Sequence, residues 1–422
     1  MRINSRSLPL TSVILISLLV FSFASQGQTI YSLPAAVTSA KSSSPILKAA
    51  SYNINMAEGS LITARLHTNP VLNNQTLQMT SSKYFSKGTE FSNPLNRQVW
   101  WQLTKPFVLP AQRRNRIDIA QQNIGLNQQG YSENIRNFSS DVANQWLNAW
   151  VLKSRLEILN EAYSNIDSLV KINKSRLKNQ VITQTDLIRT QLLQDQYQLQ
   201  RINAEKDFRN ELQRLRYLIG VTDSINVDIN GVSEFIAIPD QMDTLIAQAI
   251  RERPDVRAAR LAVLLAETNI KYQKSLVLPQ PELGMIWNPQ NTIPYLGFFG
   301  TVRVPLFDRN QGEIERSRFQ RMQADEGVRN AQVRIETEVR AAYQTYQTEK
   351  ENLRKYGLML TQADLVLDNV RYAYLKGGTT IIDFLDAQRS WFDTQQLYLN
   401  ARLSYFQSYI QVLYVTGIIN QL

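Results

Sequence analysis

The chain has 422 residues, of which 43% are hydrophobic and 19% are charged, and its formal net charge is +10. It contains no cysteine, which excludes disulfides, thiolate metal sites, cysteine nucleophiles and a lipid attached to an N-terminal cysteine. Beyond the N-terminal segment, the sequence has no apolar run of the roughly 18 residues that a membrane-spanning helix needs, so a multi-span helical membrane protein is excluded.

Residues 1–27 predict a secretory signal peptide. Arg2 and Arg6 precede an apolar stretch from Val13 to Phe23, and small residues follow it. This apolar core is too short to span a bilayer of about 30 Å. Its removal takes away two arginines and no acid, which lowers the net charge from +10 to +8. The remaining Lys and Arg are mixed with acids along helical stretches, which favours a solvated surface over a nucleic-acid interface.

The rest of the chain is an internal duplication. Asp186 to Gln191 aligns with Asp383 to Gln388, and Leu215 to Gly220 aligns with Val412 to Gly417. Both alignments have a displacement of 197 residues, which is too long for a solenoid repeat and predicts two similar half-molecules. We assign the first half to residues 28–220 and the second to residues 243–422, with residues 221–242 as a linker segment between them.

Long helices dominate each half. Alternating spacings of three and four residues predict a coiled-coil seam. In the first half this seam comprises Leu156, Leu159, Tyr163, Ile166 and Val170; its counterpart comprises Leu353, Tyr356, Leu360, Ala363 and Leu367, continuing through Val370 and Tyr374. We therefore expect long helices at residues 113–177, 185–219, 313–375 and 382–416, and shorter ones at 45–66 and 254–274.

Two segments change to a period of two and predict β-hairpins, at residues 71–107 and 282–306. They are rich in aromatic residues, which we predict to lie at a membrane interface: Trp100, Trp101, Trp287, Tyr295, Phe298 and Phe299. One apolar face with aromatics near its ends is typical of a membrane β-barrel, although hairpins that face a soluble core remain an alternative. Four strands cannot close a barrel, and open strand edges cannot lie in lipid. The chain must therefore oligomerise if the hairpins enter a membrane, and three copies would supply twelve strands.

Three motifs resemble the TolC-like outer membrane efflux family, in its heavy-metal and multidrug branch. They are Tyr374 to Gln388, Val302 to Gly312, and Arg253-Pro254-Asp255-Val256. The resemblance implies a mainly α fold with a small membrane β part, which trimerises into a 12-stranded β-barrel in the bacterial outer membrane above a periplasmic α-barrel. It also implies that the chain is the exit duct of a tripartite efflux system, with a periplasmic adaptor protein and an inner-membrane pump as partners. Residues 221–242 would then belong to the belt around the α-barrel.

The same resemblance implies two functional regions at the periplasmic end. The helix–helix turns would be tips that dock the adaptor: Asn179, Gln180, Val181, Ile182 and Thr183 in one turn, and Lys376, Gly377, Gly378, Thr379 and Thr380 in the other. Asp383 and Asp386, three residues apart on one helical face, would line the entrance, where six carboxylates of a trimer would favour cations. Tyr374 and Asp186 match positions that hold the entrance shut, but Thr379 replaces an arginine found there in some members.

Alternatives to a passive conduit stay open at this point. A periplasmic coiled-coil adaptor or a structural rod would have the same long helices. The two helix–helix turns could also be plain turns that bind no partner. Asp383 and Asp386 could be solvated surface acids or helix-capping acids. An outer-membrane enzyme would need a nucleophile beside a base, and the single imidazole, His67, sits at the helix-to-strand corner before Asn69-Pro70. We expect no enzymatic activity, no cofactor, no bound metal and no nucleic-acid partner, and the exported compound is not specified.

Overall fold

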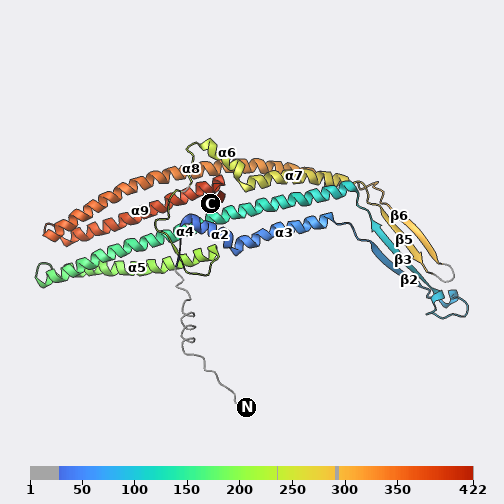
Figure 1. Cartoon of the computed structure of the whole chain (residues 1–422), viewed down its shortest axis with the longest axis horizontal. Helices are drawn as coiled ribbons and strands as arrows, with labels where there is room; N and C mark the ends of the chain where they lie inside the picture. The colour runs from blue at the N-terminus through green and yellow to red at the C-terminus, as the bar shows by residue number, and fades with distance from the viewer. Residues whose placement is uncertain (1–27, 235, 290–293, 422) are drawn as a thin grey trace, which may run out of the picture. The chain divides into compact units, whose positions relative to one another are not determined.

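The computed structural model describes residues 28–421, apart from residue 235 and residues 290–293 (Figure 1). The signal peptide predicted at residues 1–27 lies outside this range. Within it the helices are α2 (Leu33–Ser43), α3 (Pro45–Arg65), α4 (Pro110–Lys178), α5 (Gln184–Ile219), α6 (Met242–Glu252), α7 (Pro254–Ser275), α8 (Gln311–Lys376) and α9 (Ile381–Thr416). The strands are β1 (Thr29–Tyr31), β2 (Val71–Gln78), β3 (Arg97–Pro106), β4 (Ile225–Val227), β5 (Glu282–Asn288) and β6 (Tyr295–Thr301). Short 3₁₀ turns lie at Ser82–Tyr84, Pro94–Asn96 and Ile418–Gln421.

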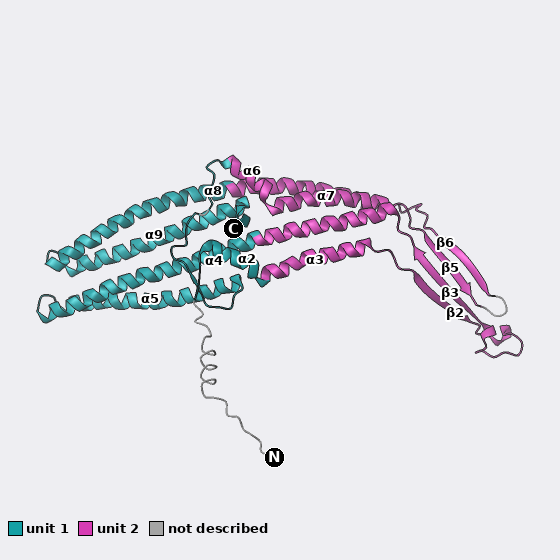
Figure 2. Ribbon diagram, in the orientation of Figure 1, with its two compact units in different colours: residues 1–45, 136–242, 340–422 teal, residues 46–135, 243–339 magenta. Residues whose placement is uncertain are grey.

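The described residues form two compact units, and each unit takes segments from both sequence halves (Figure 2). One unit comprises residues 28–45, 136–242 and 340–421, and the other comprises residues 46–135 and 243–339. We call them the turn unit and the sheet unit. Helices α4 and α8 contribute residues to both units, so the division into units differs from the division into sequence repeats.

The turn unit is held together by a coiled-coil core. Leu159, Ile166 and Leu169 of α4 pack in one cluster with residues of α5, α8 and α9. Leu156 and Tyr163 pack against the same cluster, so the 3/4 spacing of the α4 seam is confirmed. Because a seam buries one narrow stripe per helix, the opposite faces of these long helices are polar, as their composition requires.

A two-stranded parallel ladder lies in the turn unit. Strand β1 pairs with β4, with Thr29 opposite Ile225 and Tyr31 opposite Val227. Two fully buried tryptophans of α4 hold β1 and the segment that follows β4 against the helix. The indole of Trp146 donates to the Tyr31 carbonyl at 2.9 Å, and the indole of Trp150 donates to the Ile229 carbonyl at 2.9 Å. The sequence did not predict this ladder, because three residues are too few to show a period of two.

The sheet unit contains one four-stranded antiparallel sheet in the order β2-β3-β5-β6. The two predicted hairpins are neighbours in it, because β3 pairs with β5 between residues at least 176 positions apart: Trp101 lies opposite Trp287, and Leu103 lies opposite Met285. Strands β2 and β6 are the outer strands, and each is paired on one side within the described chain. On the helical side, α3 packs on α4 through Ala57, Leu61, Ala64, Ala120 and Ile124.

Two helical details differ from the sequence prediction. Helix α4 begins at Pro110, three residues before the expected start, because proline is tolerated in the first turn where its missing N–H has no partner to lose. Helices α2 and α6 lie in segments for which we predicted no helix. In the described residues, none of the helices combines the length and the apolar character that crossing a bilayer requires.

Candidate functional site

The four-stranded sheet has one strongly apolar face. Directly opposed residues share a face, so the register places Trp101 with Trp287 and Leu296, and Leu103 with Met285 and Phe298. These side chains are exposed in the single chain, and Phe298 is 82% exposed. A row of exposed apolar residues on a sheet face is a surface that requires lipid or protein to cover it.

The six predicted interface aromatics divide between the two faces of this sheet. Trp101, Trp287 and Phe298 lie on the apolar face. Trp100, Tyr295 and Phe299 lie on the other face, together with Gln102, Thr104 and Glu282, because neighbouring residues of a strand point in opposite directions. Phe299 closes over Gly284, where an added Cβ would come within 2.4 Å of the ring. The strand register therefore divides the six residues between the two faces of the sheet, and their position at a membrane interface stays a prediction.

The two predicted tips have the same backbone design. In the first turn, the Val181 N–H donates to the Arg176 carbonyl, and the Gln180 N–H donates to the Leu177 carbonyl. In the second, Gly378 and Gly377 make the equivalent bonds to Ala373 and Tyr374. This is the Schellman ending of a helix, in which one residue adopts a left-handed conformation: Gln180 with φ 56° and Gly377 with φ 81°.

After each turn, a threonine and an aspartate form a reciprocal capping box. The Asp186 carboxylate accepts from the Thr183 N–H while the Thr183 hydroxyl accepts from the Asp186 N–H. Thr380 and Asp383 repeat this arrangement at the start of α9. The turns therefore start their returning helices by the same chemistry, a Thr-x-x-Asp variant of the capping box.

Only one of the two adjacent glycines is expected to be required for the second turn. Gly377→Ala should lower the free energy of unfolding by about 1 kcal/mol, because a Cβ disfavours the left-handed conformation. Gly378→Ala is the matched control and should be neutral, because Gly378 does not have a positive φ and its added Cβ would meet the nearest atom at an ordinary 3.5 Å. Urea denaturation followed by circular dichroism measures both. Equal effects of the two substitutions would contradict this assignment.

Asp383 and Asp386 both lie on the exposed surface of α9 in the single chain. The Asp383 carboxylate accepts hydrogen bonds from the Thr380 hydroxyl at 2.7 Å and the Thr379 hydroxyl at 2.7 Å. These bonds, with a further one from the Thr380 N–H, hold the pKa of Asp383 below its ordinary value. Asp383 is thus a capping acid that stays charged at neutral pH, which leaves a second role at an entrance open.

Tyr374 and Asp186 are joined indirectly. The Tyr374 hydroxyl donates to Asn173 Oδ1 at 2.7 Å, and Asn173 Nδ2 donates to the Thr190 hydroxyl at 3.0 Å. Thr190 then donates to the Asp186 backbone carbonyl at 2.9 Å, whereas the Asp186 carboxylate is used by the cap. This relay is buried and links α8, α4 and α5. The guanidinium of Arg176 covers the Tyr374 ring at 4.8 Å.

Asn173 was not predicted as a functional residue, although its position in the sequence pattern indicates one. Asn173 follows Val170 by three residues, which makes it the next position of the seam that runs from Leu156. A polar residue at a coiled-coil seam position is a recognised device for fixing register, because it must find a partner when buried. Its fully buried amide finds two partners here, on α8 and α5.

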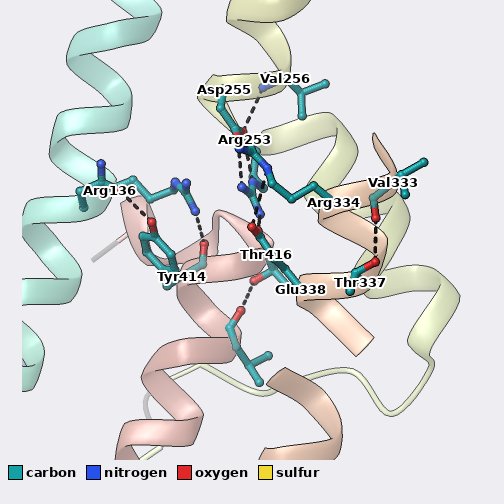
Figure 3. A network of polar contacts seen from close by, with 12 residues as sticks. Arg136, Arg253, Asp255, Val256, Val333, Arg334, Thr337, Glu338, Tyr414 and Thr416 are labelled. Atoms are coloured by element: carbon teal, nitrogen blue, oxygen red, sulfur yellow. Dashed lines mark hydrogen bonds and ion pairs between the residues drawn. The ribbon is translucent and has the colours of Figure 1, made fainter. Parts of the chain in front are cut away.

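The Arg253-Pro254-Asp255 motif forms a buried charge network in the sheet unit (Figure 3). The Arg253 side chain is 2% exposed and bonds Asp255 at 2.7 Å and Glu338 at 2.5 Å. Arg334 of α8 reaches the same Asp255 carboxylate at 2.7 Å. Pro254 begins α7, so the motif fixes the start of that helix to α8. We see a structural role for these residues, since all four charges are matched within the network.

Tyrosines of α8 and α9 hold the 221–242 segment in the turn unit. Glu234 accepts hydrogen bonds from the Tyr346 and Tyr405 hydroxyls. Tyr409 both donates to the Ile236 carbonyl at 2.9 Å and accepts from the Ile236 N–H at 2.8 Å. Burial raises the pKa of Tyr405 to about 12, so its hydroxyl remains a donor at neutral pH. This segment is therefore fixed by polar contacts as well as by packing.

The described residues contain no group of three or more His, Cys, Asp or Glu arranged to hold a metal ion. The arrangement consists of capped turns, a coiled-coil seam and an apolar sheet face. Paired coiled-coil helices combined with an antiparallel sheet that has an apolar face and two outer strands are the features expected of an outer-membrane channel built from helices and barrel strands.

Within that class, the chain belongs to the outer membrane efflux protein family, which it matches over residues 36–221 and 245–417. It is 21% identical over 370 residues to the outer membrane protein TolC of Salmonella enteritidis, covering 80% of this chain and 73% of TolC. It is 20% identical over 285 residues to the pyoverdine export outer membrane protein OpmQ of Pseudomonas putida, covering 65% of this chain and 61% of OpmQ. Its localisation is accordingly the outer membrane, and its role is efflux transport.

Solved structures of the same fold cover nearly the whole chain. A crystal structure of CusC superimposes with a TM-score of 0.76 at 17% identity, covering 94% of this chain and 96% of CusC. The open-state outer membrane channel MtrE of Neisseria gonorrhoeae gives a TM-score of 0.74 at 14% identity, covering 91% of this chain and 88% of MtrE. The predicted fold class, mainly helical with a small membrane β part, is confirmed.

Proposed function

We propose that this chain forms the exit duct of a tripartite efflux system as a homotrimer, which passively conducts compounds from a periplasmic adaptor and an inner-membrane pump to the outside. One observation carries the proposal: the sheet has an exposed apolar face, and among the described residues the outer edges of β2 and β6 are unpaired. Such edges are not tolerated in lipid, so a single copy does not suffice. Three copies give twelve strands, which is enough for a closed barrel with a lumen.

The cargo is left open by this proposal. The relatives' names include a pyoverdine exporter, a cation efflux protein and a toluene efflux protein. These differ in size, charge and polarity, and the described residues of this chain hold no metal-ligand cluster. A conduit needs no catalytic group, no cofactor and no nucleotide, so selection of the cargo falls to the pump and the adaptor.

We assign adaptor docking to the two matched turns, residues 179–183 and 376–380. Their backbone hydrogen bonds are satisfied internally, and most of their side chains are exposed, including Val181 at 66%. An exposed valine at the end of a capped turn is free for contact with a partner helix. The equal geometry of the two turns supports equivalent contacts on each half of the chain.

The oligomer is tested by the mass and location of the mature protein. We expect a detergent-extracted species of about three chain masses in the outer-membrane fraction, because edge pairing between copies is the route by which the sheet enters lipid. Size-exclusion chromatography with light scattering, together with membrane fractionation, makes the measurement. A soluble periplasmic monomer would contradict the duct and favour the adaptor or rod.

The entrance is tested by charge removal that preserves the cap. Asp383→Asn with Asp386→Asn keeps the side-chain acceptor for Thr380 but removes six carboxylates per trimer. We expect cation selectivity in planar bilayers to fall and block by a trivalent cation to weaken at least tenfold, because ring charge concentrates cations. Asp195→Asn removes three exposed carboxylates per trimer, on α5 about three helical turns from the start of that helix, and is the control. Unchanged selectivity and block in the double variant would refute the carboxylate ring.

A further inference from the structure

The charged residues on the apolar face of the sheet are both cationic. Among the strand residues that the structure describes, the register places Arg97 and Lys105 on this face, and both are exposed. Glu282 is the acid of the four strands, and it lies on the other face, opposite Pro106. The apolar face of the described strands therefore carries positive charge and no negative charge.

The two cations lie near opposite ends of β3. Lys105 follows Arg97 by eight positions, which corresponds to about 27 Å along the strand, and apolar side chains lie between them on the same face. A barrel strand tilted by about 40° covers roughly 20 Å of membrane height over that length, and the apolar band of such barrels is about 25 Å tall. Long cationic side chains extend the difference into the headgroup layers. Strand β3 thus has the length and the charge pattern of a strand that spans the band.

Lys105 contacts an aromatic ring instead of an acid. Its Nζ lies 5.8 Å from the centre of the Phe107 ring, and Phe107 directly follows the end of β3. The ring is accessible, since Phe107 is 43% exposed. Within the described part of the chain, Lys105 forms no ion pair, so its charge is not neutralised by a carboxylate. An exposed cation beside an exposed ring can bind an anion without first losing a salt bridge.

The connection from β6 to α8 adds exposed apolar side chains at the same end of the sheet. It follows Thr301, which lies opposite Glu282, and Glu282 lies opposite Pro106 next to Lys105. Residues 302–310 contain two arginines and one aspartate. Their exposed apolar members are Val304 at 71%, Leu306 at 63% and Phe307 at 92%. Apolar side chains mixed with an excess of cations are typical of a segment that lies at an anionic lipid surface.

We propose that this end of the sheet binds anionic glycerophospholipids of the leaflet that borders the periplasm. The Lys105 ammonium contacts the lipid phosphate, and Phe107 and Phe307 lie at the headgroup level. This inference rests on the duct proposed above, because that function places the helices, and hence the Lys105 end of the sheet, on the periplasmic side. An ammonium binds phosphate as a point charge, and a headgroup that carries its own cation offsets that attraction. Phosphatidylglycerol should therefore be preferred over phosphatidylcholine.

The test is native mass spectrometry of the full-length mature protein in mixed micelles with equal amounts of dioleoyl phosphatidylglycerol and dioleoyl phosphatidylcholine. The two lipids have the same acyl chains, so only the headgroup differs. We expect the trimer to retain at least threefold more phosphatidylglycerol than phosphatidylcholine. Lys105→Gln should reduce this excess at least threefold, and Lys105→Arg should preserve it. Lys171→Gln is the matched control in the turn unit: it removes a lysine whose side chain is 73% exposed and should leave the excess unchanged.

Ionic strength provides a second measurement that needs no variant. A tenfold increase in salt should lower the phosphatidylglycerol excess on the native protein, because salt screens exposed charges. Inorganic phosphate at the concentration of the lipid should not displace it, since a free ion gains nothing from the apolar residues. Equal binding of the two lipids, unchanged binding to Lys105→Gln, or displacement by free phosphate would each overturn the inference. A trimer without lipid preference overturns this inference alone, whereas a monomer in the same spectrum overturns the duct as well.

Discussion

Arg253→Met is expected to lower the free energy of unfolding by about 3 kcal/mol, because removing one partner of a buried ion pair leaves uncompensated charge. Asp255 and Glu338 would both lose their contact with the buried guanidinium. We place the value at the lower end of the usual range since Glu338 is 35% exposed and Arg334 still reaches Asp255. Urea denaturation followed by circular dichroism at 222 nm measures the change.

Arg334→Met provides the matched control, since it removes the same functional group from the same network at a site that is 50% exposed. Partly exposed ion pairs contribute about 0–1 kcal/mol, so its effect should be several-fold smaller. Equal effects of the two variants would show that burial of Arg253 does not determine the energetics. The comparison also tests whether the motif that marks the start of the second half is structural.

Periodicity was sufficient to predict the large elements of this protein. The seam residues Leu159 and Ile166 are spaced for one helical face, and burial of that face is what the 3/4 pattern reports. The hairpins were predictable for the same reason, because alternation at Leu283, Met285 and Trp287 reflects a sheet with two different faces. A long regular element repeats its hydrophobic pattern many times. The element can therefore be predicted even where a single residue departs from the pattern.

The parts that were not predicted depend on single long-range contacts. Pairing of β1 with β4 joins residues almost 200 positions apart through three residues per strand, and no local pattern records such a contact. A period of two implies that Trp100 and Trp101 point to opposite faces of the sheet. Both were nevertheless predicted as members of one interface set, because that set was chosen for its aromatic residues. The relay from Tyr374 to Asp186 required the position of Asn173 in three dimensions, and the charge network of Arg253 required Glu338 from a distant helix.

The tryptophan pair of α4 makes long-range contacts of this kind in the core of the turn unit. Trp146 and Trp150 are spaced by one helical turn and are both fully buried. Trp150 packs edge-on against Phe406 of α9 at 6.2 Å, and Lys153 on the next turn donates to the Val227 carbonyl at 2.6 Å. These contacts join α4 to α9 and to the β1–β4 ladder, and Trp150 lies at the centre of this stretch of α4.

Trp150→Ala is therefore expected to lower the free energy of unfolding by about 4 kcal/mol, as the largest core truncations do. The lost area, the cavity and the unpaired Ile229 carbonyl all act in the same direction. Trp150→Phe retains most of the packing and removes the indole hydrogen bond, so about 1–2 kcal/mol should be lost. Urea denaturation at 222 nm gives both values, and hydrogen exchange at Ile225 and Val227 reports the ladder. If Trp150→Phe destabilised as much as Trp150→Ala, the hydrogen bond to Ile229 rather than packing would dominate, and the ladder would be held chiefly by polar contacts.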